Sequence, residues 1–371
     1  MKKQECCGCG ACAAICPFEA ITMRTDREGF RYPKIDKTKC THCKRCLSVC
    51  CMRKRNVSLR EPRNIYALKY KSLKKRALSQ SGGAFSAFAE NILAQGGKVY
   101  GAAKWKPKQG VRHIEASDQK GLEPIRGSKY IQSDMSGVFQ KISAQLKAGE
   151  TILFSGTPCQ CAALRLYCEK AGNDLDSLYL CEVVCHGVPT PKIWEEYIAF
   201  IEKVKRKKVV NAVFRDKKKG WRSSSATLTF SDNSEFTRNY FNILFINNYI
   251  SRPSCYACPY AAKERHADIT AGDFWGIEKF HRRFDDNMGI SLVLINTPKG
   301  EYLFKSLSNN NVSVIESSYD KCSWAQTTLR HSHVEPKDRE DFWRLYRQKG
   351  IYGILKKYAG FSLIKELFSR S

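Results

Sequence analysis

Residues 6–17 read CCGCGACAAICP, and residues 40–51 read CTHCKRCLSVCC. Both stretches contain the spacing C-x2-C-x2-C-x3-C, in which three cysteines on a tight loop bind one 4Fe-4S cluster and the fourth binds a second cluster. The sequence therefore predicts two clusters with crossed ligand sets. Cys7 and Cys51 stand beside ligands and are interpreted as non-ligands. The first ligand set is Cys6, Cys9, Cys12 and Cys50, and the second is Cys40, Cys43, Cys46 and Cys16.

Zinc sites and disulfides are the alternative explanations for this cysteine pattern. Structural zinc sites usually pair two C-x2-C units or add histidines, whereas a third cysteine two residues further on is typical of a cluster. Disulfides need an oxidising compartment, and the chain opens with Met1-Lys2-Lys3-Gln4 rather than with an apolar signal segment. The second run departs from the usual pattern at Cys51, where a proline normally follows the last ligand. We expect iron-sulfur clusters in a reducing, cytoplasmic protein.

The composition predicts a folded and soluble chain. A length of 371 residues is typical of two or three domains, and a hydrophobic fraction of 43% supports packed cores. No apolar run approaches the ~20 residues that a bilayer span requires. Taken alone, the net charge of +27 would suggest that the protein binds nucleic acid. However, Lys and Arg are spread along the chain, and no nucleic-acid-binding signature accompanies them. We expect no nucleic acid, because a docking face for an acidic electron carrier explains the charge at least as well.

An alternating pattern of strands and helices follows the cysteine-rich segment. Strands are predicted at 65–70, 98–103, 151–155 and 178–184, with helices between them. The first of these helices opens with Ser81-Gly82-Gly83, where backbone N–H groups can approach an anion. A plain helix cap would have the same sequence.

Four further cysteines lie at loop ends in three separate segments. Cys159 is in the loop Gly156-Thr157-Pro158-Cys159-Gln160, Cys185 follows the next predicted strand, and Cys255 and Cys258 form a C-x2-C unit. Loops at the carboxyl ends of strands are where α/β sheets bind ligands, so we expect these cysteines to converge on a third 4Fe-4S cluster. A zinc site and unpaired buried thiols are the alternatives. The remaining cysteines are interpreted as buried apolar residues: Cys161, Cys168, Cys181 and Cys322.

The segment 267–276 reads ADITAGDFWG, a predicted strand that ends in a turn with two acids, two glycines and an indole. Such a turn can bring the backbone close to a planar cofactor. A structural turn with a buried tryptophan would look similar.

Together these motifs resemble the coenzyme F420 hydrogenase/dehydrogenase beta-subunit family, in the form with an N-terminal two-cluster ferredoxin domain. The resemblance implies an α+β chain, in which a two-cluster ferredoxin-like domain precedes an α/β flavin-binding domain and a helical C-terminal tail. The expected boundaries are 1–58 for the ferredoxin domain, 59–150 and 151–320 for the two parts of the flavin domain, and 321–371 for the tail. The motifs that carry the resemblance are Ser81-Gly82-Gly83, 156–160, Cys185-His186-Gly187-Val188-Pro189, Cys255-x2-Cys258 and 267–276.

The resemblance also implies a function. Residues 65–320 would bind FAD beside the third cluster, and electrons would pass between the clusters and the flavin, and as hydride to or from an organic substrate or a deazaflavin coenzyme. The expected partner is a redox protein, ferredoxin-like or another oxidoreductase subunit. His186 is the candidate proton donor beside the flavin, although a lone histidine is more often a structural hydrogen-bonding residue. The expected flavin contacts are Ser81, Gly82, Gly83, Asp268, Gly272, Asp273 and Trp275, with Thr157 and Gln160 as loop donors.

Two other functions fit parts of the sequence. An electron-relay subunit without its own substrate would hold clusters but no stoichiometric flavin, and a nucleic-acid-binding protein that uses zinc would be colourless.

The C-terminal stretch 361–368 places four apolar residues at helical spacing with Lys365 and Glu366 opposite. We expect an amphipathic helix that packs on the flavin domain, with a membrane-surface or partner-docking helix as the alternative. The four apolar residues are Phe361, Ile364, Leu367 and Phe368.

Overall fold

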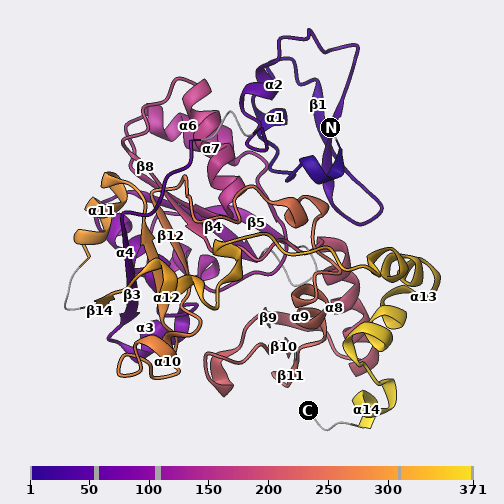
Figure 1. The fold of residues 1–371 in the computed structure, drawn as a ribbon. Helices are drawn as coiled ribbons and strands as arrows, with labels where there is room; N and C mark the ends of the chain where they lie inside the picture. Colours follow the sequence, from indigo (N-terminus) through magenta and orange to yellow (C-terminus); the bar gives the residue numbers. More distant parts are fainter. Residues whose placement is uncertain (1, 54–57, 105–109, 308–310, 369–371) are drawn as a thin grey trace.

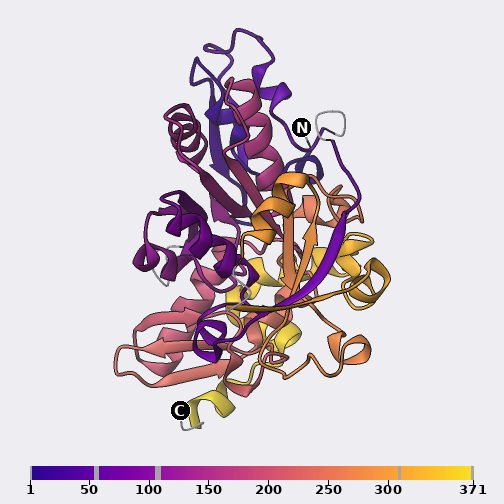
Figure 2. The same cartoon turned by 90° about the vertical axis from the view of Figure 1, so that its left-hand side faces the viewer.

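The computed structural model describes residues 2–53, 58–104, 110–307 and 311–368. Within these ranges the chain is a mixed α/β protein with a large central sheet, a small cysteine-rich N-terminal unit and a helical C-terminal region (Figure 1, Figure 2). This is the fold class that the sequence predicts. The polar segments RKR at 53–55 and EPRN at 61–64 predict a connector between the cysteine-rich unit and the central sheet, of which residues 54–57 lie outside the described residues.

The N-terminal unit consists of an antiparallel hairpin and two short helices. Each helix begins directly after a cysteine-containing turn whose N-cap residue has a positive φ, 84° at Gly10 and 61° at Lys44. These turns reverse the chain tightly, which lets cysteines three residues apart face one site. The elements are α1 (Ala11–Ala14), β1 (Ile21–Thr25), β2 (Arg31–Ile35) and α2 (Arg45–Ser48).

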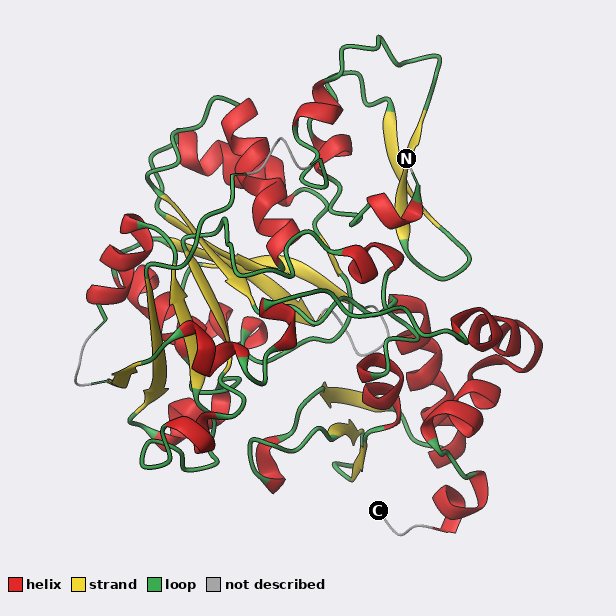
Figure 3. Cartoon of the chain, viewed as in Figure 1, coloured by secondary structure: helices red, strands yellow, loops and turns green. Residues whose placement is uncertain are grey.

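A sheet of nine strands forms the centre of the molecule (Figure 3). Its order is β14-β3-β13-β12-β8-β7-β4-β5-β6. The middle strands β12 (Ile269–Asp273), β8 (Leu178–Val183), β7 (Ile152–Gly156) and β4 (Lys98–Lys104) are parallel to one another. Their following loops therefore leave the sheet at one edge, where α/β proteins bind ligands. The outer strands are β14 (Val312–Glu316), β3 (Asn64–Tyr70), β13 (Ser291–Ile295), β5 (Val111–Ala116) and β6 (Ser133–Asp134).

Helices cover both faces of this sheet, because successive side chains of a strand point to opposite sides. Ile152 and Phe154 of β7 belong to one buried cluster with α6 (Val138–Lys147) and α7 (Pro158–Lys170). Leu153, between them, belongs to a second cluster with α4 (Ala84–Ala94). Three apolar residues of the N-terminal unit, Ala11, Ile15 and Val49, join the first cluster. The N-terminal unit is thereby fixed against the α6 and α7 side of the sheet.

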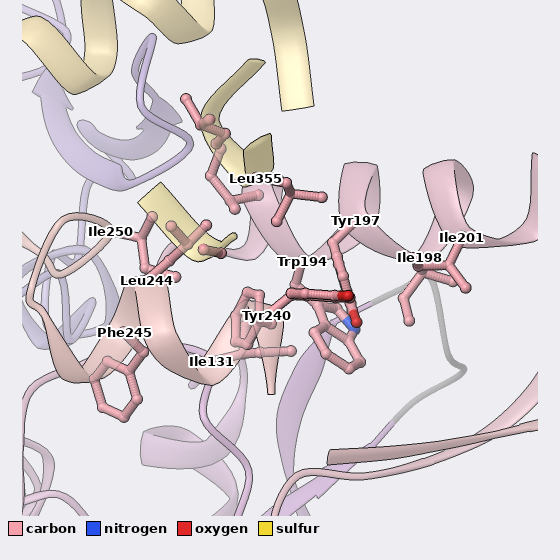
Figure 4. Packing of buried hydrophobic residues seen from close by; sticks show 14 of the residues in the cluster. Ile131, Trp194, Tyr197, Ile198, Ile201, Tyr240, Leu244, Phe245, Ile250 and Leu355 are labelled. Carbon is pink, nitrogen blue, oxygen red and sulfur yellow. The ribbon is translucent and has the colours of Figure 1, made fainter. Parts of the chain in front are cut away.

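A second lobe packs around Trp194, which lies on α8 (Pro191–Lys205) (Figure 4). The Trp194 ring is 4.4 Å from that of Phe214 and 4.9 Å from that of Phe241, measured between centroids. Buried residues of α8 recur every three or four positions, which gives the helix one apolar side. The other elements of the lobe are β9 (Val209–Val213), β10 (Ala226–Phe230), β11 (Glu235–Arg238), α9 (Tyr240–Ile246) and α13 (Arg339–Ala359).

The C-terminal helix α14 (Leu363–Phe368) is shorter than the expected 361–368. Phe361 is buried and its ring contacts those of Phe200 and Tyr240, so this part of the tail packs on the preceding chain. Ile364 is 73% exposed, whereas Glu366 is fully buried. The side chains of Leu367 and Phe368 lie outside the described residues. Of the helices in the described ranges, none has both the length and the apolar composition needed to cross a membrane.

Glu366, which the sequence places on the polar side of this helix, is buried. Its carboxylate accepts hydrogen bonds from Arg238 Nε at 2.8 Å and from Tyr240 Oη at 2.6 Å. These two partners belong to the second lobe and draw the polar side of the helix inward. A local helical pattern could not reveal a partner more than 120 residues away in the chain.

Glu366→Gln should lower the free energy of unfolding by about 2 kcal/mol, because it removes a buried charge that Arg238 and Tyr240 contact. Urea unfolding followed by circular dichroism measures this loss. Lys365→Gln is the control, since Lys365 is the exposed neighbour on the same helix and its change should stay within about 0.5 kcal/mol. Equal stability of both variants would mean that the contacts of Glu366 with Arg238 and Tyr240 do not stabilise the fold.

Candidate functional site

The structure brings together cysteines of the two N-terminal runs. Burial and the thiols of Cys6 and Cys50 raise the pKa of Cys12 to about 12. Burial and the thiols of Cys16 and Cys43 raise the pKa of Cys46. In both cases one cysteine comes from the other run, as crossed ligand sets require. Thiols packed in this way are costly to ionise unless a cation binds them, which is the chemistry of a cluster site.

Cys7 and Cys51, which the sequence pattern left without a ligand role, lie directly beside Cys9. The three sulfur atoms lie within 4.8 Å of one another, and those of Cys7 and Cys51 are 3.5 Å apart. Hydrogen bonds from Cys51 and Cys7 lower the pKa of Cys9 to about 6. Cys7 also reaches Cys159, where its thiol is the largest cause of a raised pKa. The N-terminal unit therefore touches the central domain through Cys7.

A short backbone pairing brings the later cysteines together. Pro189 pairs with Ser251 as an antiparallel bridge, and the N–H of Arg252 donates to the Val188 carbonyl at 3.0 Å. This pairing lays the loop after β8 alongside the segment that leads to η5 (Pro253–Ala257). Because β7 and β8 are adjacent and parallel, the loops after them leave the same edge. The four cysteines expected at a third cluster, Cys159, Cys185, Cys255 and Cys258, line one cavity.

This four-cysteine cavity has a volume of about 40 Å³. Organic cofactors need pockets of about 300–1,000 Å³, so the cavity suits only a compact inorganic group. Burial, followed by the neighbouring Cys159 thiol, raises the pKa of Cys185 and of Cys258 to about 12. Four half-buried thiols around one cavity fit a thiolate-binding metal centre, and this donor set suits zinc and iron-sulfur clusters alike.

A larger cavity of about 470 Å³ adjoins the four-cysteine cavity. The two share six lining residues, Thr157, Cys185, His186, Gly187, Val188 and Thr328. The volume lies within the range of organic cofactor sites. Eight residues that the sequence analysis expects at the flavin line this larger cavity: Ser81, Gly83, Thr157, Gln160, His186, Gly272, Asp273 and Trp275.

Gly82 and Asp268 are not among the lining residues and have structural roles instead. A Cβ on Gly82 would come within 2.1 Å of the Leu68 carbonyl oxygen, so only glycine permits this close approach of α4 to β3. The Asp268 carboxylate accepts hydrogen bonds from Leu180 N at 2.9 Å and Thr297 Oγ1 at 2.8 Å. The sequence placed both residues in a cofactor motif because their neighbours in the chain line the cavity.

Several polar groups of the cavity wall are already paired with each other. The Gln160 side-chain oxygen accepts hydrogen bonds from Thr157 N and Thr157 Oγ1, both at 3.0 Å, which caps α7. Asp273 accepts from Arg215 Nη1 and from Trp221 Nε1, both at 2.6 Å. The Trp275 ring stacks on Trp221 with centroids 4.8 Å apart. These pairings make a fixed wall at the end of β12.

His186 stands where the two cavities meet. Burial and the nearby His333 lower the pKa of His186 to about 4, so the imidazole is neutral at pH 7. The two rings have centroids 3.6 Å apart, and among the described residues neither Nε2 atom has a hydrogen-bond partner. A neutral imidazole is a poor acid, which counts against the expected role of His186 as proton donor.

Sequence reasoning missed the contribution of the segment 324–333. Gln326 and Thr328 line the larger cavity, and Gln326 Nε2 donates to the Asp273 carbonyl at 2.5 Å. Thr328, Ser332 and His333 line the four-cysteine cavity. The only signal was a polar stretch with two histidines, which no spacing rule connects to residues far earlier in the chain.

Comparison with protein families agrees with this division of the chain. Residues 149–321 match the family model for the C terminus of the coenzyme F420 hydrogenase/dehydrogenase beta subunit. Residues 5–53 match the model for a 4Fe-4S dicluster domain. The first match contains the four cysteines expected at a third cluster (Cys159, Cys185, Cys255 and Cys258, here the third cysteine group), and the second contains both N-terminal runs.

Two individual proteins are similar to parts of the chain. A chain of the F420-reducing [NiFe] hydrogenase complex from Methanosarcina barkeri has a TM-score of 0.50 and 17% identity, over 80% of this chain and 91% of that chain, so the two share a fold. A stretch of 45 residues is 44% identical to a protein of the Na(+)-translocating ferredoxin:NAD(+) oxidoreductase complex of Acetobacterium woodii. That match spans only 12% of either chain.

The stability of the protein should fall as the pH decreases from about 6.5 to about 4, in part because of His113, which lines the larger cavity. Burial lowers its pKa to about 4, against about 6.5 in the unfolded chain, so the unfolded state binds the proton more readily within this window. His113→Gln cannot take up the proton and should reduce the loss across the window by about 2 kcal/mol. Urea unfolding at several pH values measures the difference.

His331→Gln serves as the control for this measurement, because His331 is exposed. Its profile should follow that of the unmodified protein. An equally steep decline in His113→Gln would mean that the His113 ring is accessible to protons in the folded protein.

Proposed function

Because the chain belongs to the coenzyme F420 hydrogenase/dehydrogenase beta-subunit family, in the form that carries an N-terminal 4Fe-4S dicluster domain, we propose that it is an iron-sulfur flavoprotein oxidoreductase. In this proposal the N-terminal runs would hold two clusters, Cys159, Cys185, Cys255 and Cys258 would hold a third, and the larger cavity would hold FAD. The clusters would carry single electrons, and the flavin would combine two electrons and a proton into a hydride for a small organic substrate. The reverse direction uses the same path.

The observation that carries this proposal is the shared wall of the two cavities. Thr157, Cys185 and His186 line both, so a metal centre in one would lie beside an organic cofactor in the other. Cys7 of the N-terminal unit also lines the four-cysteine cavity, where it contacts Cys159. The order is therefore cysteine loop, four-cysteine cavity and organic cofactor cavity, which is the order that stepwise electron transfer needs.

The larger cavity has the features that a flavin dinucleotide requires. Gly83, the N-cap of α4, lines the cavity with a φ of 94°, and the N–H groups of Gly82 and Ala84 beside it donate to Ser291 Oγ. Arg215 and Arg222 also line the cavity, each held by ion pairs, Arg215 with Asp273 and Arg222 with Glu278 and Asp285, and Trp275 adds a planar indole. A bound flavin supplies the conversion between single electrons and hydride. The residues of the chain bind it, orient it and exclude water from it.

Electron entry is best assigned to the outer end of the N-terminal unit. Cys43 is exposed there, and Phe18, Ile35 and Leu47 are exposed apolar residues of the same N-terminal unit. An acidic ferredoxin would find charge complementarity and apolar contact on one surface. The exposed basic residues of this surface are Lys37, Lys39, Lys44 and Arg45.

Anaerobic purification after cluster reconstitution tests the proposal. The protein should bind about one flavin per chain and about twelve iron atoms, the content of three 4Fe-4S clusters. A reduced acidic ferredoxin should bleach the flavin absorbance in stopped flow, at a rate that falls steeply with ionic strength. If the protein holds clusters but no flavin, the chain is an electron-relay subunit without its own substrate. If it is colourless and holds zinc, the oxidoreductase proposal is wrong.

Cys255→Ser should separate the third cluster from the other two. We expect the iron content to fall from about twelve to about eight atoms per chain. The N-terminal clusters should still accept electrons from ferredoxin, while reduction of the flavin slows at least tenfold because its neighbouring cluster is missing. Iron assay and stopped flow measure the two effects.

Cys322→Ser is the matched control, since Cys322 is a fully buried thiol that does not line the four-cysteine cavity. It should retain the full iron content. Full iron content and unchanged flavin reduction in Cys255→Ser would contradict the third cluster.

A further inference from the structure

Arg252 is a fully buried arginine whose hydrogen bonds to oxygen all involve neutral groups. Its Nε donates to the Cys6 carbonyl at 2.7 Å, its Nη1 to Gln132 Oε1 at 2.9 Å and its Nη2 to the Arg31 carbonyl at 2.9 Å. The guanidinium also lies over the Tyr32 ring at 4.3 Å. Each of the three guanidinium nitrogens therefore has an acceptor, but none of these contacts neutralises the charge.

Within the part of the chain that the structure describes, no carboxylate forms an ion pair with Arg252. The acids of the adjoining hairpin have their own cations, since Asp26 pairs with Lys3 and Glu28 with Arg339, each at 2.5 Å. Arg265, which lines the same four-cysteine cavity, is also buried but pairs with Glu182 at 2.5 Å. A buried charge without a counter-charge is strongly unfavourable, so Arg252 requires an anion that the side chains do not provide.

The position of Arg252 indicates what that anion is. A Cβ on Gly8 would lie 2.6 Å from Nη1, so the guanidinium is seated on the backbone between Cys7 and Cys9. Gln132, its partner, also donates to the Cys7 carbonyl at 2.9 Å. Arg252 is at the same time a lining residue of the four-cysteine cavity. One cation thus stands between the first cysteine run and the third cysteine group.

We propose that Arg252 is the electrostatic link between the first N-terminal cluster and the third cluster, and that it raises the reduction potential of both. This inference rests on the proposed function. Four thiolates give a 4Fe-4S centre a net negative charge, and reduction by one electron adds another. A nearby buried cation stabilises the reduced state more than the oxidised state, and net charge is one of the factors that set cluster potentials.

The consequence is a direction for electron flow. The second N-terminal cluster site lies in the exposed loop of Cys40 and Cys43, away from the contacts of Arg252. Electrons that enter there would move toward the two inner clusters, because the cation favours reduction beside it. Arg252 is a positioning residue in this scheme, since it acts through the clusters and not on the substrate.

Arg252→Met in the cluster-loaded protein tests the link, with EPR-monitored redox titration as the measurement. Loss of the charge should lower the potentials of the first and third clusters, so that the ratio of reduced to oxidised cluster at a fixed potential falls about tenfold, or 59 mV for a one-electron couple. Arg252→Lys keeps the charge and should keep potentials close to those of the unmodified protein. Gln132→Met removes two neutral hydrogen bonds but no charge, and it should also leave the potentials in place.

The outcomes separate a charge effect from a structural one. Unchanged potentials in Arg252→Met would overturn the proposal, and so would an equal shift in Arg252→Lys or in Gln132→Met. If Arg252→Met cannot hold its clusters, Arg252→Lys becomes the test. Cluster potentials equal to those of the unmodified protein would support the proposal, and lowered potentials in Arg252→Lys would overturn it. Protein that lacks flavin, or that lacks the third cluster, would defeat the proposed function, yet the potential of the first cluster would still test Arg252.

Discussion

The pairing of the 188–190 loop with residues 250–252 is the constraint on which the rest of the site depends. It consists of one bridge, Pro189 with Ser251, and the flanking hydrogen bonds from Thr190 to Ile250 and from Arg252 to Val188. This pairing positions the C-x2-C unit of Cys255 and Cys258 at the edge of the sheet where β7 and β8 end. The same pairing fixes the backbone of Arg252, whose side chain then reaches the loop of Cys6. A few backbone hydrogen bonds therefore position both a ligand group and the charge beside it.

Two kinds of wall enclose the adjoining cavities. The strand-end loops of the central sheet provide one wall, and their carbonyl and amide groups are held by the sheet itself. The other wall comes from the second lobe and the segment 324–333, through side chains such as Arg215 and Gln326. Asp273 joins the two, because its carboxylate binds Arg215 and Trp221 while its carbonyl accepts from Gln326. The shape of the larger cavity thus depends on contacts between segments more than 50 residues apart.

The features that the sequence predicts correctly depend on residues close together in the chain, and the features that it misses depend on residues far apart. The cysteine runs, the middle strands and the helices after them are local patterns of spacing and hydrophobicity, and the structure contains them. Burial of Cys161, Cys168, Cys181 and Cys322 is confirmed for the same reason, since each lies in an apolar surrounding. Asp268, Glu366 and Arg252 have roles set by partners far away in the chain, and a charged residue carries no local sign that it is buried. The misassignment of Asp268 arose because a strand has two ends, and only the carboxyl end of β12 meets the cavity.

The excess of positive charge acts in two different ways in this molecule. Exposed lysines of the N-terminal loops interact through water and salt, so their attraction for an acidic partner extends only about one Debye length, ~8 Å at physiological ionic strength. Arg252 is enclosed by protein, where salt screens its charge much less than it screens an exposed charge. Salt should therefore change how fast electrons arrive at the outer cluster while leaving the energetic preference for the inner ones in place. Under the proposed function, the outer charge would govern the encounter with an acidic partner protein, and the inner charge would govern which cluster is reduced.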